Sequence, residues 1–173
     1  KGTKEEGGIK NMIKKDKKLV LVFIGSLKHH VDCIAPCVGK LIEKRNKSQC
    51  IVLYCDQTQI AETKTKLKEY PKEEYQILAL DVGFLEGSRK FLVQNKGITP
   101  AKLIKPTQRT VIGDMGIIIN ISGIYSGSLK NQKKKLLRNE NSPKIHKRVN
   151  KIIKDTYIEV DKLLKMLEGG QDD

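Results

Sequence analysis

The feature that most constrains the fold is an uninterrupted apolar run over residues 19–24, LVLVFI, which ends at Gly25-Ser26. Six apolar residues match the length of a β-strand, and a strand without polar alternation is usually covered on both of its faces. Strands of this kind occupy the middle of sheets that have helices on both sides. The run therefore predicts a central strand of an α/β sheet.

The rest of the chain alternates between strand-like runs and segments of helical period. The strand-like runs lie at residues 50–55, 75–80, 91–93 and 115–121. The helical segments lie at residues 32–45, 56–70 and 143–167, and the last begins behind Ser142-Pro143, a typical cap and first-turn proline. Residues 95–109 contain Gly97, Pro100 and Pro106 and are expected to form a long loop. This order predicts a three-layer α/β/α sandwich around a mostly parallel sheet, in one domain over residues 19–168.

Charge is distributed unevenly along the chain. The 34 Lys and Arg residues exceed the 20 Asp and Glu residues by 14, which makes anionic partners plausible and excludes an acidic surface. Residues 1–18 are rich in Lys and are expected to form a flexible basic tail. A second basic segment, from Lys130 to Lys154, is a candidate nucleic-acid contact, although it lacks the interleaved aromatics that base stacking needs. A solvated loop and helix face explains the same residues.

The apolar segments and the cysteines of the chain indicate the compartment in which it works. No apolar run approaches the roughly 18–20 residues of a membrane span, and the first residues lack an apolar signal core, so a cytoplasmic protein without a membrane partner is expected. The cysteines lie inside apolar segments, which predicts buried free thiols. The alternative is a metal site of His29, His30, Cys33 and Cys37, whose spacing matches neither a zinc knuckle nor a C-x-x-C pair.

Acidic residues occur at the predicted ends of two strands. Asp32 follows the first strand, and Asp81 ends the third. In open α/β sheets ligands bind at the carboxyl ends of the strands, so these two side chains are expected to meet in one crevice. Asp114 precedes the last strand and reaches the same crevice only if that strand runs antiparallel.

Two carboxyl groups in one pocket do not ionise together easily, so the pKa of one of them rises. One can then act as general base on a water while the other donates a proton to a leaving amine, which is the chemistry of an aspartic peptidase. The same pair could hold a divalent metal ion. The structural alternative is that Asp32 caps a helix and Asp81 is a polar strand end.

The residues around both acids form recognisable motifs. The first is Ile24-Gly25-Ser26, followed by Asp32, Pro36 and Val38-Gly39, and the second is Ala79-Leu80-Asp81. A third lies at residues 111–124, VIGDMGIIINISGI. Together they resemble the YyaC family of sporulation proteins, which is related to the germination protease and to the hydrogenase-maturation endopeptidases, and the resemblance spans about residues 19–124.

The resemblance implies a phosphorylase/hydrolase-like α/β/α fold and a peptidase activity in the forespore or spore. It implies catalytic roles for Asp32 and Asp81, with support from Gly25, Ser26 and Asp114. In the hydrogenase-maturation relatives, acids at these two places help to bind a metal. The chain departs from the family pattern around the first acid. Leu27 replaces an Asp, His30-Val31 replaces Thr-Gly, and Ala35 replaces a Gly. His29 and His30 are most often exposed turn residues, and the alternative is a replacement ligand or proton carrier beside Asp32.

Three functions follow from these features. The first is a peptidase-like protein of sporulation or germination that acts on a protein substrate through Asp32 and Asp81 and needs no cofactor. The second is a non-catalytic basic module that binds nucleic acid or another polyanion. The third is a metal-dependent hydrolase with Asp32, Asp81 and either His30 or Asp114 as ligands. The sequence is compatible with a monomer or an oligomer.

Overall fold

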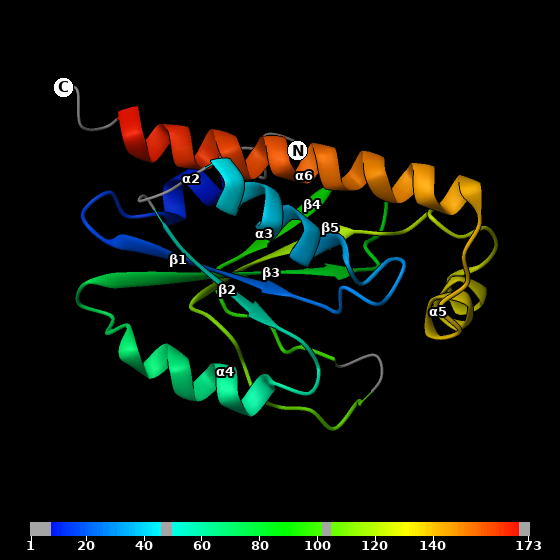
Figure 1. Ribbon diagram of the computed structural model, residues 1–173, viewed down its shortest axis with the longest axis horizontal. Coiled ribbons are helices and arrows are strands. Elements are labelled where there is room, and N and C mark those ends of the chain that lie inside the picture. The colour runs from blue at the N-terminus through cyan, green and yellow to red at the C-terminus, as the bar shows by residue number, and fades with distance from the viewer. Residues whose placement is uncertain (1–7, 46–49, 102–104, 170–173) are drawn as a thin grey trace.

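A computed structural model describes residues 8–45, 50–101 and 105–169 of the chain. Five strands form one sheet, and helices pack on both of its faces (Figure 1). The strands are β1 (Lys18–Ile24), β2 (Cys50–Cys55), β3 (Tyr75–Gly83), β4 (Phe91–Gln94) and β5 (Met115–Asn120). The helices are α2 (Gly8–Met12), α3 (Ile34–Arg45), α4 (Ile60–Lys66), α5 (Leu129–Leu137) and α6 (Pro143–Gly169), and a short 3₁₀ turn (Leu67–Glu69) extends α4.

The sheet has the strand order β2-β1-β3-β5-β4. Strand β1 pairs in parallel with β2 and β3, and β3 pairs in parallel with β5, whereas β4 runs antiparallel at the edge. The predicted mostly parallel α/β/α sandwich is therefore confirmed. The neighbouring positions of β1 and β3 matter most for the site, because they bring the ends of two acid-bearing segments to the same edge.

The side chains of strand β1 contribute to two separate hydrophobic cores, as its unbroken apolar sequence predicts. Leu19, Leu21 and Phe23 point to one face, where they pack with residues of α3 and α6. Val20, Val22 and Ile24 point to the other face, toward α4. Figure 1 shows the same layers, with α2, α3 and α6 on one side of the sheet and α4 on the other. All six apolar residues of β1 are at most 3% exposed.

The long C-terminal helix agrees closely with its prediction. It begins at Pro143 and ends at Gly169, and the backbone N–H of Ile145 donates to Ser142 Oγ at 3.2 Å, so Ser142 caps the helix as expected. The Lys-rich helix after β2 is shorter than predicted. Helix α4 starts at Ile60, because residues 56–58 form a turn in which Asp56 Oδ1 accepts from the N–H of Thr58 at 2.8 Å.

Two helices occupy segments in which the sequence indicated none. Helix α2 lies in the predicted basic tail, where the next residue, Ile13, is 6% exposed and packs into the core. The side chain of Gln76 bonds to the backbone N–H and C=O of Lys14, which anchors this segment to β3. The tail prediction is thus wrong for residues 8–13, and its residues 1–7 lie outside the described part of the chain. The other unexpected helix is α5, which lies beyond the carboxyl ends of the strands (Figure 1).

The expected long loop before β5 is largely a loop, with residues 102–104 outside the described part of the chain. Its start is held by an antiparallel bridge in which Ile98 and Ile112 exchange two backbone hydrogen bonds of 2.9 and 2.8 Å. This bridge fixes residues 98–101 close to the sheet. Within the described residues, no helix combines the length and the apolar character that crossing a membrane requires.

Candidate active site

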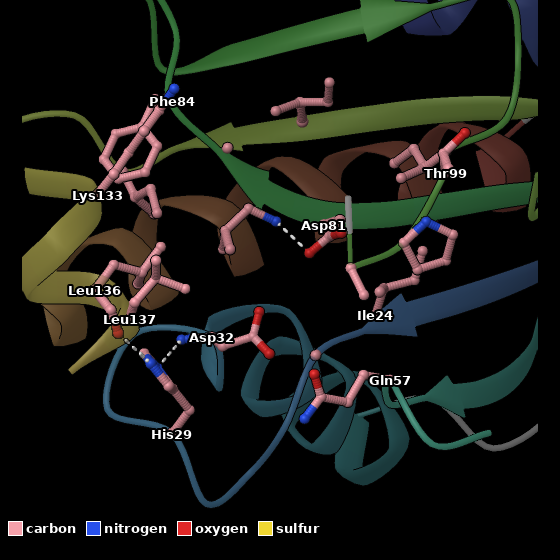
Figure 2. Close-up of a pocket in the computed structure, with 18 residues that line it drawn as sticks. Ile24, His29, Asp32, Gln57, Asp81, Phe84, Thr99, Lys133, Leu136 and Leu137 are labelled. Carbon is pink, nitrogen blue, oxygen red and sulfur yellow. Dashed lines mark hydrogen bonds between the residues drawn. The ribbon is translucent and has the colours of Figure 1, made fainter. Parts of the chain in front are cut away.

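The two acids named from the sequence meet at one edge of the sheet. In the parallel pairing of β1 with β3, Phe23 lies opposite Leu80, one residue before Asp81. Asp32 follows β1 in a loop of residues 25–33 that turns back over the strand ends before α3 begins. Figure 2 shows both carboxyl groups facing the same space. The expectation that Asp32 and Asp81 share one crevice therefore agrees with the structure.

Gly25 and Ser26 hold Asp32 in place. The backbone N–H of Ser26 donates to Asp32 Oδ2 at 2.9 Å. Gly25 has a φ of +145°, and a Cβ on it would lie 2.0 Å from the backbone oxygen of Asp32. The loop can fold back over β1 only because this position has no side chain. Both residues named from the motif thus position the carboxylate.

The surroundings raise the pKa of both carboxyl groups. Burial raises the pKa of Asp32, although the hydrogen bond from the Ser26 N–H favours its ionised form. Burial and, second, the charge of Asp32 raise the pKa of Asp81 well above its ordinary value, against a hydrogen bond of 2.8 Å from the N–H of Val82 to Asp81 Oδ1. Asp81 is therefore the member of the pair that keeps its proton to higher pH.

The pair opens into a cavity of about 470 Å³ with mostly apolar walls. Figure 2 shows Leu136 and Leu137 of α5 on one side of the acids and Thr99 on the other. Carboxyl groups in such a cavity have few polar neighbours, which explains why burial is the largest influence on both pKa values. Apart from the acids and His29, the lining residues are Ile24, Gly25, Gln57, Val82, Gly83, Phe84, Ile98, Thr99, Pro100, Ala101, Ile118, Ile121, Lys133, Leu136 and Leu137.

His29 ties the Asp32 loop to the α5 wall. Its Nδ1 accepts from the backbone N–H groups of Asp32 at 2.9 Å and Val31 at 3.1 Å. Its Nε2 lies 2.8 Å from the carbonyl oxygen of Leu136. Because Nδ1 accepts two bonds and a carbonyl can only accept, the ring is neutral with its proton on Nε2. The sequence indicated both His29 and its neighbour His30 as candidates beside Asp32.

His30 does not reach the cavity. Its ring packs edge-on against His146 at a centroid distance of 5.5 Å, and its backbone N–H donates to Asn139 Oδ1 at 2.8 Å. Both contacts point it toward the start of α6, away from the acids. The predicted role as a ligand or proton carrier beside Asp32 is therefore not supported by its position. Nothing in the sequence distinguishes the two histidines, since they are adjacent in a turn.

Asp114 lies at the opposite edge of the sheet. Strand β5 runs parallel to β3, so the residue before it sits at the amino ends of the strands. There the N–H of Ile77 donates to Asp114 Oδ2 at 3.1 Å, and the N–H of Asp114 donates to the Ile77 carbonyl at 2.9 Å. The condition under which Asp114 would join the site is not met, and its supporting role is corrected to a structural one.

The donor groups around the pair do not fit a protein-bound metal ion. Both nitrogens of His29 are engaged, which leaves two carboxylates in the cavity, whereas catalytic metal sites usually have three or more protein ligands. Among the described residues, no group of three or more His, Cys, Asp and Glu side chains is arranged to hold a metal ion. We derive no step through a metal.

The alternative site at His29, His30, Cys33 and Cys37 is not assembled either. The two histidine rings make the contacts described above. Burial and the neighbouring Cys37 raise the pKa of Cys33 to about 12, so its sulfur is a thiol, which donates to the His30 carbonyl at 3.6 Å. Cys55 is fully buried, whereas Cys33, Cys37 and Cys50 are half-buried, so the prediction of buried thiols holds in full for one of the four.

Comparisons with known proteins give limited matches. No family model matches the chain, and no curated protein matches it. One similar solved structure is the crystal structure of the [NiFe] hydrogenase maturation protease HycI from Thermococcus kodakarensis KOD1. The alignment has 13% sequence identity and a TM-score of 0.49, and it covers 91% of this chain and 98% of that one. The resemblance to the YyaC family therefore rests on its sequence motifs.

Proposed function

We propose that this protein is a peptidase-like hydrolase in which Asp32 and Asp81 form the catalytic pair. The observation that supports it is the shared cavity, in which the charge of one carboxylate helps to raise the pKa of the other. Two carboxyl groups with separated pKa values supply a base and an acid at the same pH. Hydrolysis of an amide needs both.

The difference between the two environments assigns the roles. Asp32 accepts a hydrogen bond from Ser26 and is the better stabilised anion, so it takes a proton from a water molecule. The resulting hydroxide oxygen bonds to the amide carbonyl carbon. Asp81, which holds its proton more tightly, transfers that proton to the nitrogen as the C–N bond breaks. The products are a carboxylic acid and an amine, and the proton now on Asp32 returns to Asp81 through solvent.

His29 takes no part in this proton transfer. Both of its nitrogens already form hydrogen bonds, and its contact to Asp32 is through the backbone rather than the carboxylate. It is a positioning residue for the Asp32 loop. The remaining walls of the cavity are mainly apolar and suit an apolar substrate side chain beside the bond to be cleaved.

The sequence motifs extend this proposal to a biological setting. They relate the chain to sporulation and germination proteins, and on that basis we propose a protein substrate that is processed in the forespore or spore. A cytoplasmic location is part of the same proposal.

Cleavage assays on paired variants test the function. Wild-type protein is incubated with a library of internally quenched peptides, and Asp32→Asn and Asp81→Asn are compared with Glu62→Gln, an exposed control on α4. Each aspartate variant should lose at least about a hundredfold in cleavage rate while its circular dichroism stays unchanged. The control should retain full activity. Cleavage that survives in both folded aspartate variants would refute the proposal.

A second candidate function is polyanion binding through the segment from Lys130 to Lys154. The observation that favours it is that Lys130, Lys144, Lys147 and Lys151 have no acidic partner among the residues that the structure describes. Phosphate contacts of this kind weaken steeply with salt. Titration of labelled duplex and single-stranded DNA at two salt concentrations tests it, and absence of binding at the lower one rejects it.

A further inference from the structure

A groove runs between α3 and α6 on the outer surface of the molecule. It has a volume of about 680 Å³ and shares no residue with the cavity at Asp32 and Asp81. Figure 1 shows the two helices side by side on the same face of the sheet. We call it the α3/α6 groove, and its lining residues are Leu41, Lys44, Arg45, Asn150, Ile153, Lys154, Tyr157 and Ile158.

The floor of the groove is apolar and accessible. Leu41 is 38% exposed and Ile158 is 40% exposed, whereas the apolar residues on the inner side of both helices are buried. Ile153 and Tyr157 are half-buried between them and pack against the core. An apolar strip along two adjacent helices has the shape that receives the apolar face of a third helix.

The rim of the groove is cationic. Lys44 and Lys154 are exposed and have no acidic partner among the described residues, and Lys147 and Lys151 continue the row on the preceding turns of α6. Arg45 differs, because Asp161 and Glu168 already neutralise it. No acidic side chain lines the groove within the part of the chain that the structure covers. The rim therefore complements a negatively charged partner.

We propose that the α3/α6 groove binds an acidic amphipathic helix of a partner protein. Its apolar side would lie on Leu41 and Ile158, and its acidic side chains would lie beside Lys44 and Lys154. A second copy of this chain fits poorly, because it would bring the same cationic rim against this one in a protein of net charge +14. Nucleic acid fits less well than a helix, because Tyr157 is the one aromatic side chain among the groove's lining residues.

Fluorescence anisotropy with a synthetic peptide tests this inference. The probe is a fluorescein-labelled peptide of about 16 residues with Leu at i, i+3, i+4 and i+7 and Glu elsewhere, and its control has the same composition in scrambled order. The protein variants are Lys154→Glu, Ile158→Ser and Leu41→Ser. Lys66→Glu on α4 is the matched charge control, because Lys66 is exposed and does not line the groove. All four positions are exposed, and thermal unfolding confirms that each variant folds.

The expected result has three parts. Wild-type protein binds the probe with a micromolar dissociation constant and binds the scrambled peptide about tenfold less tightly. Lys154→Glu weakens probe binding by about tenfold, and each serine variant weakens it by about three- to tenfold. Lys66→Glu leaves probe binding within about twofold.

Three results would overturn the inference. One is no binding of the probe at low salt, and another is equal weakening by Lys66→Glu and Lys154→Glu, which indicates general charge attraction. The third is tighter binding of duplex DNA than of the probe with the same dependence on Lys154, because the surface would then be a nucleic-acid site. None of these outcomes bears on Asp32 and Asp81, so this inference stands or falls separately from the proposed peptidase activity.

Discussion

Replacement of His29 by alanine removes three hydrogen bonds, two within the Asp32 loop and one that joins this loop to α5. Two backbone N–H groups, those of Val31 and Asp32, lose their acceptor, and the Leu136 carbonyl loses its donor. Each unpaired, partly buried group costs about 1 kcal/mol, so the variant should lose about 2–3 kcal/mol of its free energy of unfolding. Urea unfolding followed by circular dichroism measures this change.

Two conservative variants separate the contributions. In His29→Asn, the side-chain oxygen can take the position of Nδ1 and keep the bonds within the loop, while the link to α5 is lost. In His29→Gln, the amide nitrogen can reach the Leu136 carbonyl, while the loop bonds are lost. His29→Asn should therefore recover about half or more of the stability lost in His29→Ala, since it restores two of three bonds.

Activity provides a readout that a purely structural role would not change. With the loop bonds kept, His29→Asn should retain kcat. It should raise KM, because the hydrogen bond between the loop and the α5 wall of the cavity is lost. His29→Gln should lower kcat, because Asp32 is no longer held at its place. A loss of less than about 0.5 kcal/mol in the free energy of unfolding of His29→Ala would refute the reasoning, since three unpaired polar groups destabilise a protein by more than that. So would identical kinetics for the Asn and Gln variants.

Two further predictions concern Asp81 and Gly25, which line the same cavity as His29. The folded state holds a proton on Asp81 that the unfolded state releases above its ordinary carboxyl pKa of 3.8, so wild-type stability should fall as the pH rises above that value. Asp81→Asn should reduce this fall, leaving the part due to Asp32, and be the more stable protein at pH 7 but not at pH 4. Equal pH profiles in urea unfolding would contradict the assignment. Gly25→Ala should cost about 3 kcal/mol or more, because of the positive φ and the contact with Asp32. Gly123→Ala, at a positive φ in open space, is the control and should cost less.

The main strands could be predicted because their apolar runs reflect burial on both faces. Successive side chains of residues 19–24 point into two different cores, so every position of this strand is buried and requires an apolar residue. The meeting of Asp32 and Asp81 could also be predicted, because strands of one parallel sheet share a carboxyl edge. The adjacency of β1 and β3, which brings the acids into one cavity, depends on strand order, and strand order is decided by contacts between distant segments.

The missed features depend on tertiary contacts. Helix α5 has the sequence LKNQKKKLL, which reads as a solvated basic segment; only Leu136 in it is buried. The placement of Asp114 depended on the direction of β5, which an apolar run does not reveal. The choice of His29 over His30 depended on a carbonyl 107 positions later in the chain. Local pattern carries no information on such pairs.

The cavity is built from parts that are attached to the protein in different ways. Asp81 is part of a central strand, and Asp32 is tied to the end of its neighbour, so the reacting groups move only if the sheet itself moves. The α5 wall is a surface helix that two hydrogen bonds join to the Asp32 loop, one from His29 to Leu136 and one from His30 to Asn139 just past the helix end. Selectivity and reactivity are thus encoded in separate segments, and changes in α5 can alter which side chains enter while the carboxyl pair stays intact.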